Sequence, residues 1–589
     1  IKLKSSGSNG SIKLTAVADI KFYSGTDFQT QTFETKSGGV DVYGHCQIRS
    51  GGELRLGDSD NSNRVGFKAP STVAADKIWT LPAADGGNGE VLKTDGSGNL
   101  SWGAGGGSGP EVTATASGTI ADKGAVVVNS DGTVSAVSQD AAVTGSIVAE
   151  SSGNGGNSTM AYDTANGKVV HIYVYSNNLY GRVGTTNTNG SLSWGSEVTV
   201  WDGTGNVGFP DIAFASDTEV FYLFYRRWTG NDSRGYVTKI TVSGTTFSTA
   251  QTTQVVPQDG PEHGCIALDS DGGGMIVWKS NISGENNRLK ANVLTFGSNA
   301  SSISAGSRQE VNAGNTANYP SVAYDPANDN YCICWENNSM SGRFTVIKAT
   351  VAGTSSITFQ GTNNINSVLS RETQVLNIGA GKFLGLWAQK GNDDVRGTII
   401  TMNADNTISF STATILYTTA GSGDVNMMNN NCLVKVDYLT DTYAVLMMDY
   451  GSNSKGVLQF FTASGSTITP TDTIQLWPNG LNNPSLVYDS DKKLLVTAGR
   501  DANNNYYISS RIYRKAQSNA DANNFLGFAS AGYSNGNTAT IKVVGNTVTG
   551  LSGLSPGKKY YVQGNGTLGT TSTSVEAGLS LTSSSLLIR

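Results

Sequence analysis

The sequence predicts an all-β protein organised around a seven-bladed β-propeller. A short phrase, for example PSVAYD at Pro320–Asp325, recurs at intervals of 52–60 residues between Gly153 and Arg514. Its seven copies end at Tyr162, Phe214, Leu268, Tyr324, Leu376, Val436 and Tyr488. A more apolar run follows each phrase, and each repeat holds short β-like runs between turns rich in Asn, Gly, Ser and Asp, without helical periodicity. Such a unit cannot bury its own apolar faces, and four antiparallel strands per repeat are typical of a propeller blade.

The seventh repeat contains only three clear strands before the sequence changes character near Ser518. Because a closed ring needs a complete last blade, we expect a strand from the region Val134–Val148 to supply the missing edge. One large side chain per repeat stands at the same position of the apolar runs. We expect this column to fill the space between neighbouring blades rather than to bind a ligand; its members are Tyr175, Tyr225, Trp278, Trp335, Trp387 and Met447.

The ring, residues 135–519, is expected to be inserted into a small β domain made of residues 110–134 and 520–589. GAVVVNSDGTV (Gly124–Val134) and GKKYYVQGNGTL (Gly557–Leu568) are near-copies, each a strand running into a Gly-containing turn. The chain would leave the small domain, pass around the ring and return, so that its two crossing points lie close together, as domain insertion requires.

Residues 1–62 consist of short alternating strand fragments that are too short to bury a face in a single chain. We expect an extended, β-rich shaft in which three chains share a narrow core; the alternative is a disordered leader. Residues 63–109 form a separate module that ends in the flexible Gly-rich linker GAGGGSG (Gly103–Gly109).

The second module resembles a known family. Gly66–Pro70 (GFKAP), Trp79–Pro82 (WTLP) and Asp95–Trp102 (DGSGNLSW) are similar in sequence and order to a module of phage tail-fibre proteins, especially those of marine cyanobacterial viruses. The two segments that flank the ring also look like phage structural proteins. The resemblance implies a virion tail appendage assembled in the host cytoplasm as a homotrimer. Its partners would be other phage tail or baseplate proteins and a glycan or protein receptor on the host cell.

Composition excludes some functions. The net charge of −6 and a pI of about 5.3 argue against nucleic-acid binding, which requires a basic face. No run of eighteen apolar residues occurs, so we predict no membrane insertion. The odd number of cysteines and their positions inside strands predict buried free thiols; they are Cys46, Cys265, Cys332, Cys334 and Cys432.

No metal, cofactor or catalytic residue is predicted. His45, His171 and His263 are far apart in the sequence, lack zinc-ligand spacing and are each expected to be structural. Acidic turns such as Asp58–Asp60, Asp269–Gly272 and Asp489–Asp491 offer oxygen ligands for calcium, but turn formation explains them better. A sialidase-like enzyme would need converging arginines with a Tyr and a Glu. Six arginines are available, but the Asp-box motif is missing; they are Arg226, Arg227, Arg288, Arg343, Arg371 and Arg500.

The best binding candidates are Arg226, Arg227 and Trp228, which continue past the apolar run of the second repeat toward a turn. Indole and guanidinium groups suit sugar stacking and carboxylate pairing; the alternative is an ordinary exposed hairpin. The predicted function is therefore that of a structural tail-fibre protein, not an enzyme, whose propeller acts as an adhesion head through multivalent contacts. The alternatives are a glycan-degrading, sialidase-like propeller enzyme and a purely structural appendage or decoration protein.

Overall fold

The structure is a computed structural model that describes residue 48 and residues 52–589, apart from gaps at 61, 77, 88–89, 105–108, 271, 283, 285–286, 312–315, 341, 366–368, 390, 392–393, 420–424, 428–430, 451–454 and 479. The chain divides into two units, Ile1–Ser108 and Gly109–Arg589. Apart from three short 3₁₀ turns (Ser298–Ala300, Asn338–Met340 and Ala502–Asn504), every described element is a β-strand, which confirms the all-β prediction. No described helix is long and apolar enough to cross a membrane.

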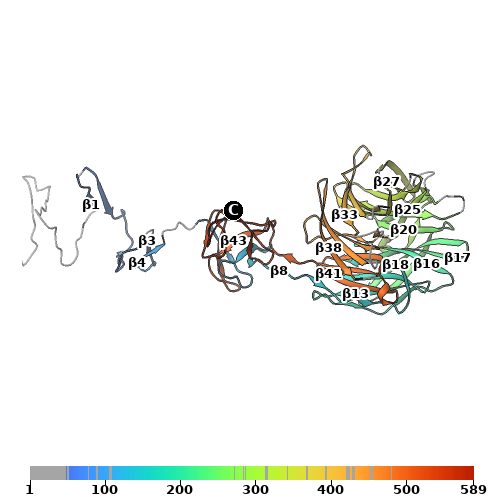
Figure 1. Cartoon of the computed structure of the whole chain (residues 1–589), viewed down its shortest axis with the longest axis horizontal. Coiled ribbons are helices and arrows are strands. Elements are labelled where there is room, and N and C mark those ends of the chain that lie inside the picture. Colours follow the sequence, from blue (N-terminus) through green and yellow to red (C-terminus); the bar gives the residue numbers. More distant parts are fainter. Residues whose placement is uncertain are drawn as a thin grey trace, which may run out of the picture. The chain divides into compact units, whose positions relative to one another are not determined.

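Between residues 143 and 514 the described strands form seven antiparallel sheets of four or five strands each (Figure 1). The first sheet contains β11 (Gly155–Asp163), β12 (Lys168–Tyr175), β13 (Asn178–Thr186), β14 (Leu192–Trp194) and β15 (Val198–Trp201). The second contains β16 (Asn206–Ala215), β17 (Val220–Thr229), β18 (Asp232–Ser243) and β19 (Thr246–Val256). The third contains β20 (Pro261–Leu268), β21 (Gly273–Ser280), β22 (Leu289–Phe296), β23 (Ile303–Ala305) and β24 (Gln309–Glu310).

The fourth sheet contains β25 (Ala317–Asp325), β26 (Asn330–Asn337), β27 (Arg343–Ala352) and β28 (Ser356–Asn364). The fifth contains β29 (Ser370–Gly379), β30 (Lys382–Gln389), β31 (Asp394–Met402), β32 (Ile408–Phe410) and β33 (Thr414–Thr418). The sixth contains β34 (Val425–Asn426), β35 (Leu433–Lys435), β36 (Thr442–Asp449), β37 (Lys455–Ser464) and β38 (Thr467–Trp477). The seventh contains β39 (Leu481–Asp489), β40 (Leu494–Asp501), β41 (Tyr507–Arg514), β9 (Val143–Thr144) and β10 (Val148–Ala149).

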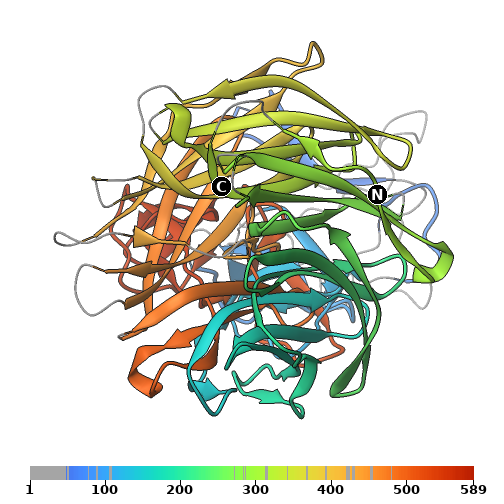
Figure 2. The ribbon, with the colours of Figure 1, turned by 90° about the vertical axis from the view of Figure 1, so that its right-hand side faces the viewer.

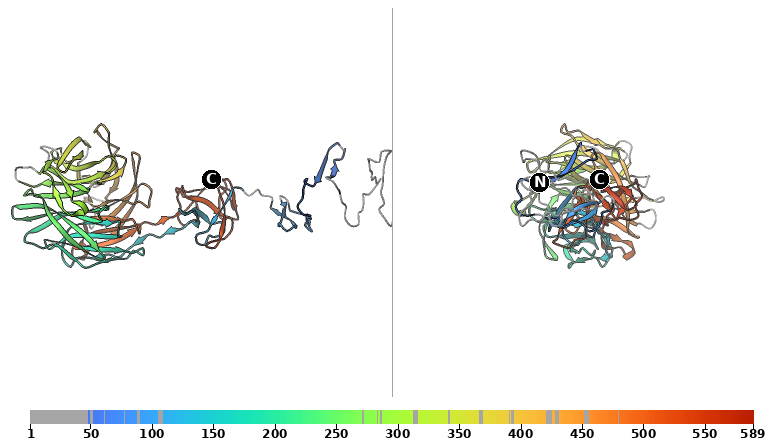
Figure 3. Two further views of the ribbon diagram at one scale, coloured as in Figure 1. Left: turned by 180° about the vertical axis from the view of Figure 1, so that it is seen from behind. Right: turned by 90° about the vertical axis from the view of Figure 1, so that its left-hand side faces the viewer.

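These sheets close into a circle. One strand of each sheet contacts a strand of the next sheet, in the order β11, β16, β20, β25, β29, β35 and β39, and β39 contacts β11. In Figure 2 the colours run around the circle from teal through green and yellow to orange, and Figure 3 shows the same ring from behind. A hydrophobic cluster fills each space between neighbouring sheets of the described ring. Five of the six side chains predicted to fill these spaces are fully buried in the clusters, which confirms their packing role: Tyr225, Trp278, Trp335, Trp387 and Met447. Tyr175 is half-buried and belongs to none of these clusters, so the prediction was wrong for it.

The ends of the ring are joined by residues that lie far apart in the sequence. Both β9 and β10 pair antiparallel with β41, which confirms the expectation that the region just before the ring completes the last sheet. The edge is two short strands rather than a continuous one. Glu150, directly after β10, bonds through Oε2 to Nδ1 of buried His171 in the first sheet at 2.8 Å. This contact ties the closing strands to the first sheet.

The remaining strands of the second unit form two more five-stranded sheets. The first joins β5 (Glu111–Thr115), β6 (Ala125–Val128) and β7 (Val134–Ala136) with β43 (Phe525–Ala529) and β44 (Thr538–Lys542). The second contains β45 (Thr547–Thr549), β46 (Lys559–Val562), β47 (Leu568–Gly569), β48 (Glu576–Thr582) and β49 (Ser585–Ile588). A shared hydrophobic core contains side chains of both sheets. The pair β8 (Gln139–Asp140) and β42 (Gln517–Ser518) carries the chain between these sheets and the ring.

The described part of the first unit contains two hairpins, β1 (Glu53–Gly57) with β2 (Arg64–Lys68) and β3 (Glu90–Thr94) with β4 (Leu100–Ala104). Cross-strand pairing places four apolar side chains on one face of the first hairpin, and they are between 50% and 73% exposed: Leu54, Leu56, Val65 and Phe67. No described residue of the first unit covers this face. The shaft predicted for residues 1–62 falls mostly outside the described residues.

Candidate binding site

A β-bulge interrupts the first strand of six sheets at equivalent positions. A bulge adds one residue to one strand of a pair and redirects a side chain. Each bulge lies directly before, or at the start of, the recurring phrase. The register shifts fall between Gly155 and Ser158, Gly208 and Asp211, Glu262 and Cys265, Asn318 and Ser321, Arg371 and Gln374, and Asn482 and Ser485.

Five of these bulges hold a residue other than glycine in the left-handed region of backbone space, with φ between 46° and 52°: Phe209, His263, Tyr319, Glu372 and Asn483. This conformation costs a residue with a Cβ about 1–2 kcal/mol, whereas glycine adopts it freely. Strained positions that are not occupied by glycine cluster at functional sites. The side chains at these five positions are therefore candidates for a function at this end of the ring.

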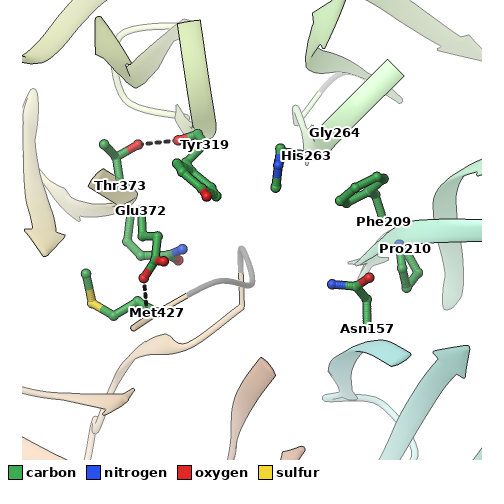
Figure 4. A pocket seen from close by; sticks show the side chains of 10 residues that line it. Asn157, Phe209, Pro210, His263, Gly264, Tyr319, Glu372, Thr373 and Met427 are labelled. Atoms are coloured by element: carbon green, nitrogen blue, oxygen red, sulfur yellow. Dashed lines mark hydrogen bonds between the residues drawn. The ribbon is translucent and has the colours of Figure 1, made fainter. Parts of the chain in front are cut away.

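Four of these side chains line one cavity at the mouth of the ring (Figure 4). Phe209 of β16, His263 of β20 and Tyr319 of β25 form a row, with ring centroids 4.7 Å apart for the first pair and 4.5 Å for the second. Glu372 of β29 lines the same cavity and accepts a hydrogen bond from the backbone N–H of Met427. Asn157 of β11 contributes an amide. Residues from distant repeats thus meet in a single site.

The imidazole and phenol of this row are neutral at physiological pH. Removal from water, reinforced by the positive charges of Lys279 and Arg226, lowers the pKa of His263 to about 4. Burial, reinforced by the negative charges of Glu372 and Glu336, raises the pKa of Tyr319 to about 12. The mouth therefore offers aromatic faces together with neutral donors and acceptors.

Below the mouth, a buried polar contact connects sheets across the ring. Nδ2 of Asn431, in the sixth sheet's segment, donates to Oγ1 of Thr159 at 2.8 Å and to Oδ1 of Asp211 at 2.9 Å. The backbone N–H of Ile266 donates to the other oxygen of Asp211. Removal from water nevertheless raises the pKa of Asp211 to about 7, against these hydrogen bonds, which lower it.

The mouth lies at the end of the strands opposite the point where the chain joins and leaves the ring. In the seventh sheet, Leu481 pairs with Asp501 at the end that carries the bulge at Asn483. At the other end Arg514 pairs with Val143, and the chain continues into the pair β8–β42. The bulged ends of the strands are consequently not occupied by the connection to the rest of the chain.

Arg226, Arg227 and Trp228 lie at the end of β17, on this same edge of the ring, but they do not form one cluster. Arg226 forms an ion pair with Glu262 at 3.2 Å, and its guanidinium carbon is 4.6 Å from the Trp228 ring centroid and 5.9 Å from that of Phe209. Arg226 thus lies between the mouth and Trp228. Arg227 points to the other face of the strand, into a separate groove that Trp228 also borders.

The other residues considered in the sequence have structural roles or fall outside the described residues. His171 pairs with Glu150, as expected for a structural histidine, whereas His263 lines the mouth and was not predicted to do so. Asp269 and Asp489 each accept a hydrogen bond from a turn N–H, as turn formation requires. The four described cysteines are free and buried, as predicted: Cys265, Cys332, Cys334 and Cys432. His45 and Cys46 lie outside the described residues.

The sequence contains a signal for the mouth that the repeat analysis did not use. The mouth residues stand at the start of the recurring phrase or directly before it: Phe209 begins FPDIAF, and Tyr319 precedes PSVAYD. These equivalent positions of the repeats carry chemically different side chains, whereas positions that only pack would favour similar ones. Comparing the residues at this one position of the repeats would have identified Phe209, His263, Tyr319 and Glu372 as a set.

Comparisons with known proteins give no family for this chain. No family model matches it, and no curated protein matches it. Among solved structures it is similar to the periplasmic gluconolactonase PpgL of Pseudomonas aeruginosa, with 12% sequence identity and a TM-score of 0.36 over 66% of this chain and 98% of that chain. A likeness at this level carries no statement about activity, so the function has to be argued from the residues of the site.

Proposed function

We propose that this chain is a tail-fibre protein of a phage virion and that its ring is a seven-bladed β-propeller that binds a host-cell receptor. The observation that carries the proposal is the set of strained bulges that direct chemically different side chains into one mouth. That mouth lies at the strand ends opposite the connection to the rest of the chain. A recognition head displayed by a fibre needs this arrangement, because its free end must meet the cell.

The chemistry of the mouth suits a carbohydrate. The cavity has a volume of only about 20 Å³, room for about one water molecule. We therefore propose that a sugar ring lies across its opening, against the rings of Phe209 and Tyr319, with the neutral side chains of Asn157 and His263 beside its hydroxyl groups. Glu372 adds an acceptor whose position is fixed by the N–H of Met427. The receptor that this site supports best is therefore a cell-surface glycan, bound without turnover.

The first unit supports a trimeric fibre. A two-stranded hairpin is marginally stable by itself, and the apolar face of β1 and β2 is exposed among the residues that the structure describes. The opposite face carries the ion pair of Glu53 with Lys68 at 3.2 Å. Three chains that bury their apolar faces together would stabilise the hairpin and display three rings. Three weak sites then act together, and avidity replaces single-site affinity.

The experiment uses the full-length protein on a glycan array and on candidate host cells. Tyr319→Gly and His263→Gly remove a mouth side chain and leave the backbone in a conformation that glycine prefers. Glu219→Gly is the matched control, because Glu219 also has a positive φ, 53°, but lies in an exposed turn outside the mouth. We expect the two mouth variants to lose glycan binding and the control to retain it. Equal binding by all three would contradict the proposal.

A glycan-degrading enzyme is the second candidate, because Tyr319 and Glu372 line the same cavity. A sialidase-like mechanism uses a tyrosine nucleophile activated by a carboxylate. Incubation of bound glycans with the protein separates the two functions. Release of a reducing sugar that Tyr319→Phe abolishes would establish the enzyme, and retention of intact ligand would support the adhesin. A purely structural appendage would bind no glycan in either assay.

A further inference from the structure

Arg227 is a half-buried cation surrounded by aromatic rings. Its guanidinium carbon lies 4.1 Å from the ring centroid of Tyr236, 4.9 Å from that of Tyr225 and 5.4 Å from that of Trp201. These three rings come from β15, β17 and β18, so two neighbouring sheets build the enclosure. Aromatic faces attract a cation, but they do not satisfy its N–H donors.

Most of the donors of Arg227 remain available. One Nη2 N–H donates to the Tyr225 hydroxyl, whereas the buried Nε has no hydrogen-bond partner among the described residues. No described carboxylate forms an ion pair with Arg227, although other arginines of this edge have one, such as Arg226 with Glu262 and Arg234 with Asp232. Removing a charge from water without a counter-ion is costly. This site therefore lacks an anion.

The groove beside Arg227 has room for one. It is lined by Trp201, Thr204, Trp228, Asp232 and Arg234 and has a volume of about 340 Å³, within the range of small-ligand sites, about 300–1,000 Å³. The carboxylate of Asp232 is already held by Nε of Arg234 at 2.8 Å, so the uncompensated charge in the groove is that of Arg227. Two indoles provide apolar walls for a sugar ring.

We propose that this groove binds a sugar unit carrying an anionic group, a carboxylate or a sulfate, with Arg227 as its ion-pair partner. The proposal rests on the proposed glycan-binding function and deepens it: the mouth binds neutral units, and the groove on the second sheet selects for an acidic one. A planar guanidinium matches a carboxylate or sulfate with two parallel hydrogen bonds, which lysine does not provide. Trp228, stacked on Arg226, lies between the two sites.

The test is a ligand-observed NMR titration of the full-length protein with methyl β-glucuronide, glucose 6-sulfate and methyl β-glucoside. We expect one or both acidic sugars to bind more tightly than the neutral one, with the preference weakening as salt is raised. Whichever acidic sugar binds identifies the group. Arg227→Gln should weaken acidic binding by about 10- to 100-fold, the range expected for charge-assisted hydrogen bonds. Arg227→Lys should give an intermediate loss.

The matched control is Arg500→Gln, which removes the same charge from an arginine of the seventh sheet that lies outside the groove and whose guanidinium carbon is 4.3 Å from the ring centroid of Tyr506. It should retain the preference for acidic sugars. Equal affinity for acidic and neutral sugars in the unmodified protein, or equal losses in Arg227→Gln and the control, would overturn the proposal. Tyr319→Gly distinguishes a failure of this acidic-sugar site from a failure of the glycan-binding function. If Tyr319→Gly abolishes glycan binding while Arg227→Gln changes nothing, the mouth binds glycans and the acidic site in the groove is refuted.

Discussion

Replacing Tyr319 by glycine and by alanine separates backbone strain from side-chain packing at the mouth. Both variants remove the same phenol ring and its contact with His263, 4.5 Å between centroids. They differ only in the Cβ, which alanine retains at a φ of 46°. The difference between their free energies of unfolding therefore reports the strain stored in this bulge.

The expected difference follows from two opposing terms. At an ordinary backbone position alanine is more stable than glycine by about 0.5–1 kcal/mol, because glycine loses more conformational freedom on folding. In the left-handed region the Cβ costs about 1–2 kcal/mol. The strain outweighs the entropy, so Tyr319→Gly should be more stable than Tyr319→Ala by about 0.5–1 kcal/mol. Both variants should lose glycan binding to the same extent.

The measurement is guanidinium unfolding of the full-length protein, followed by tryptophan fluorescence and compared at a common slope. Asn318 is the matched control position, since it is the preceding residue of the same strand and has no positive φ. There Asn318→Ala should be more stable than Asn318→Gly, which reverses the order found at Tyr319. If alanine is more stable at both positions, the bulge is unstrained and the argument from strain to function at the mouth fails.

Three further outcomes are expected. Light scattering should give a mass near three times 61.5 kDa. Phe67→Asp, which places a charge on the apolar hairpin face, should lower this mass toward that of a single chain, whereas Arg64→Asp on the polar face should not. The pKa of Asp211, about 7 when folded, is above its unfolded value, so its contribution to stability is present below about pH 4 and is lost as the pH rises to about 7. The free energy of unfolding should fall over this window by up to about 4 kcal/mol, and Asp211→Asn should flatten this pH dependence. The pKa of His263, about 4, predicts that one of the three histidines stays neutral down to about pH 5 in an NMR titration. Sugar binding should then not change between about pH 6 and 8. A normal titration of His263 near pH 6.5 would show that its imidazole is not desolvated.

Sequence reasoning reached furthest where neighbouring residues decide the outcome. Alternation within a strand depends on residues two apart, so the buried column of Trp278, Trp335 and Trp387 could be read directly. The missing edge of the last repeat identified the region of β9 and β10, because an incomplete sheet needs a partner. The sequence placed Arg226, Arg227 and Trp228 at the end of one strand but did not separate its two faces. Their role in binding stays a prediction.

The sequence by itself determined the period, the strand character of each repeat and the aromatic contacts between sheets, because these follow from local alternation repeated at a regular spacing. Only the tertiary structure decided the candidate site. Phe209, His263, Tyr319 and Glu372 are more than fifty residues apart from one to the next, and they meet only when the ring closes. The bulges also add one residue to each strand, which breaks the alternation rule and turns these side chains into the mouth. Long-range closure and a local break in register are the two features that no short-range pattern contains.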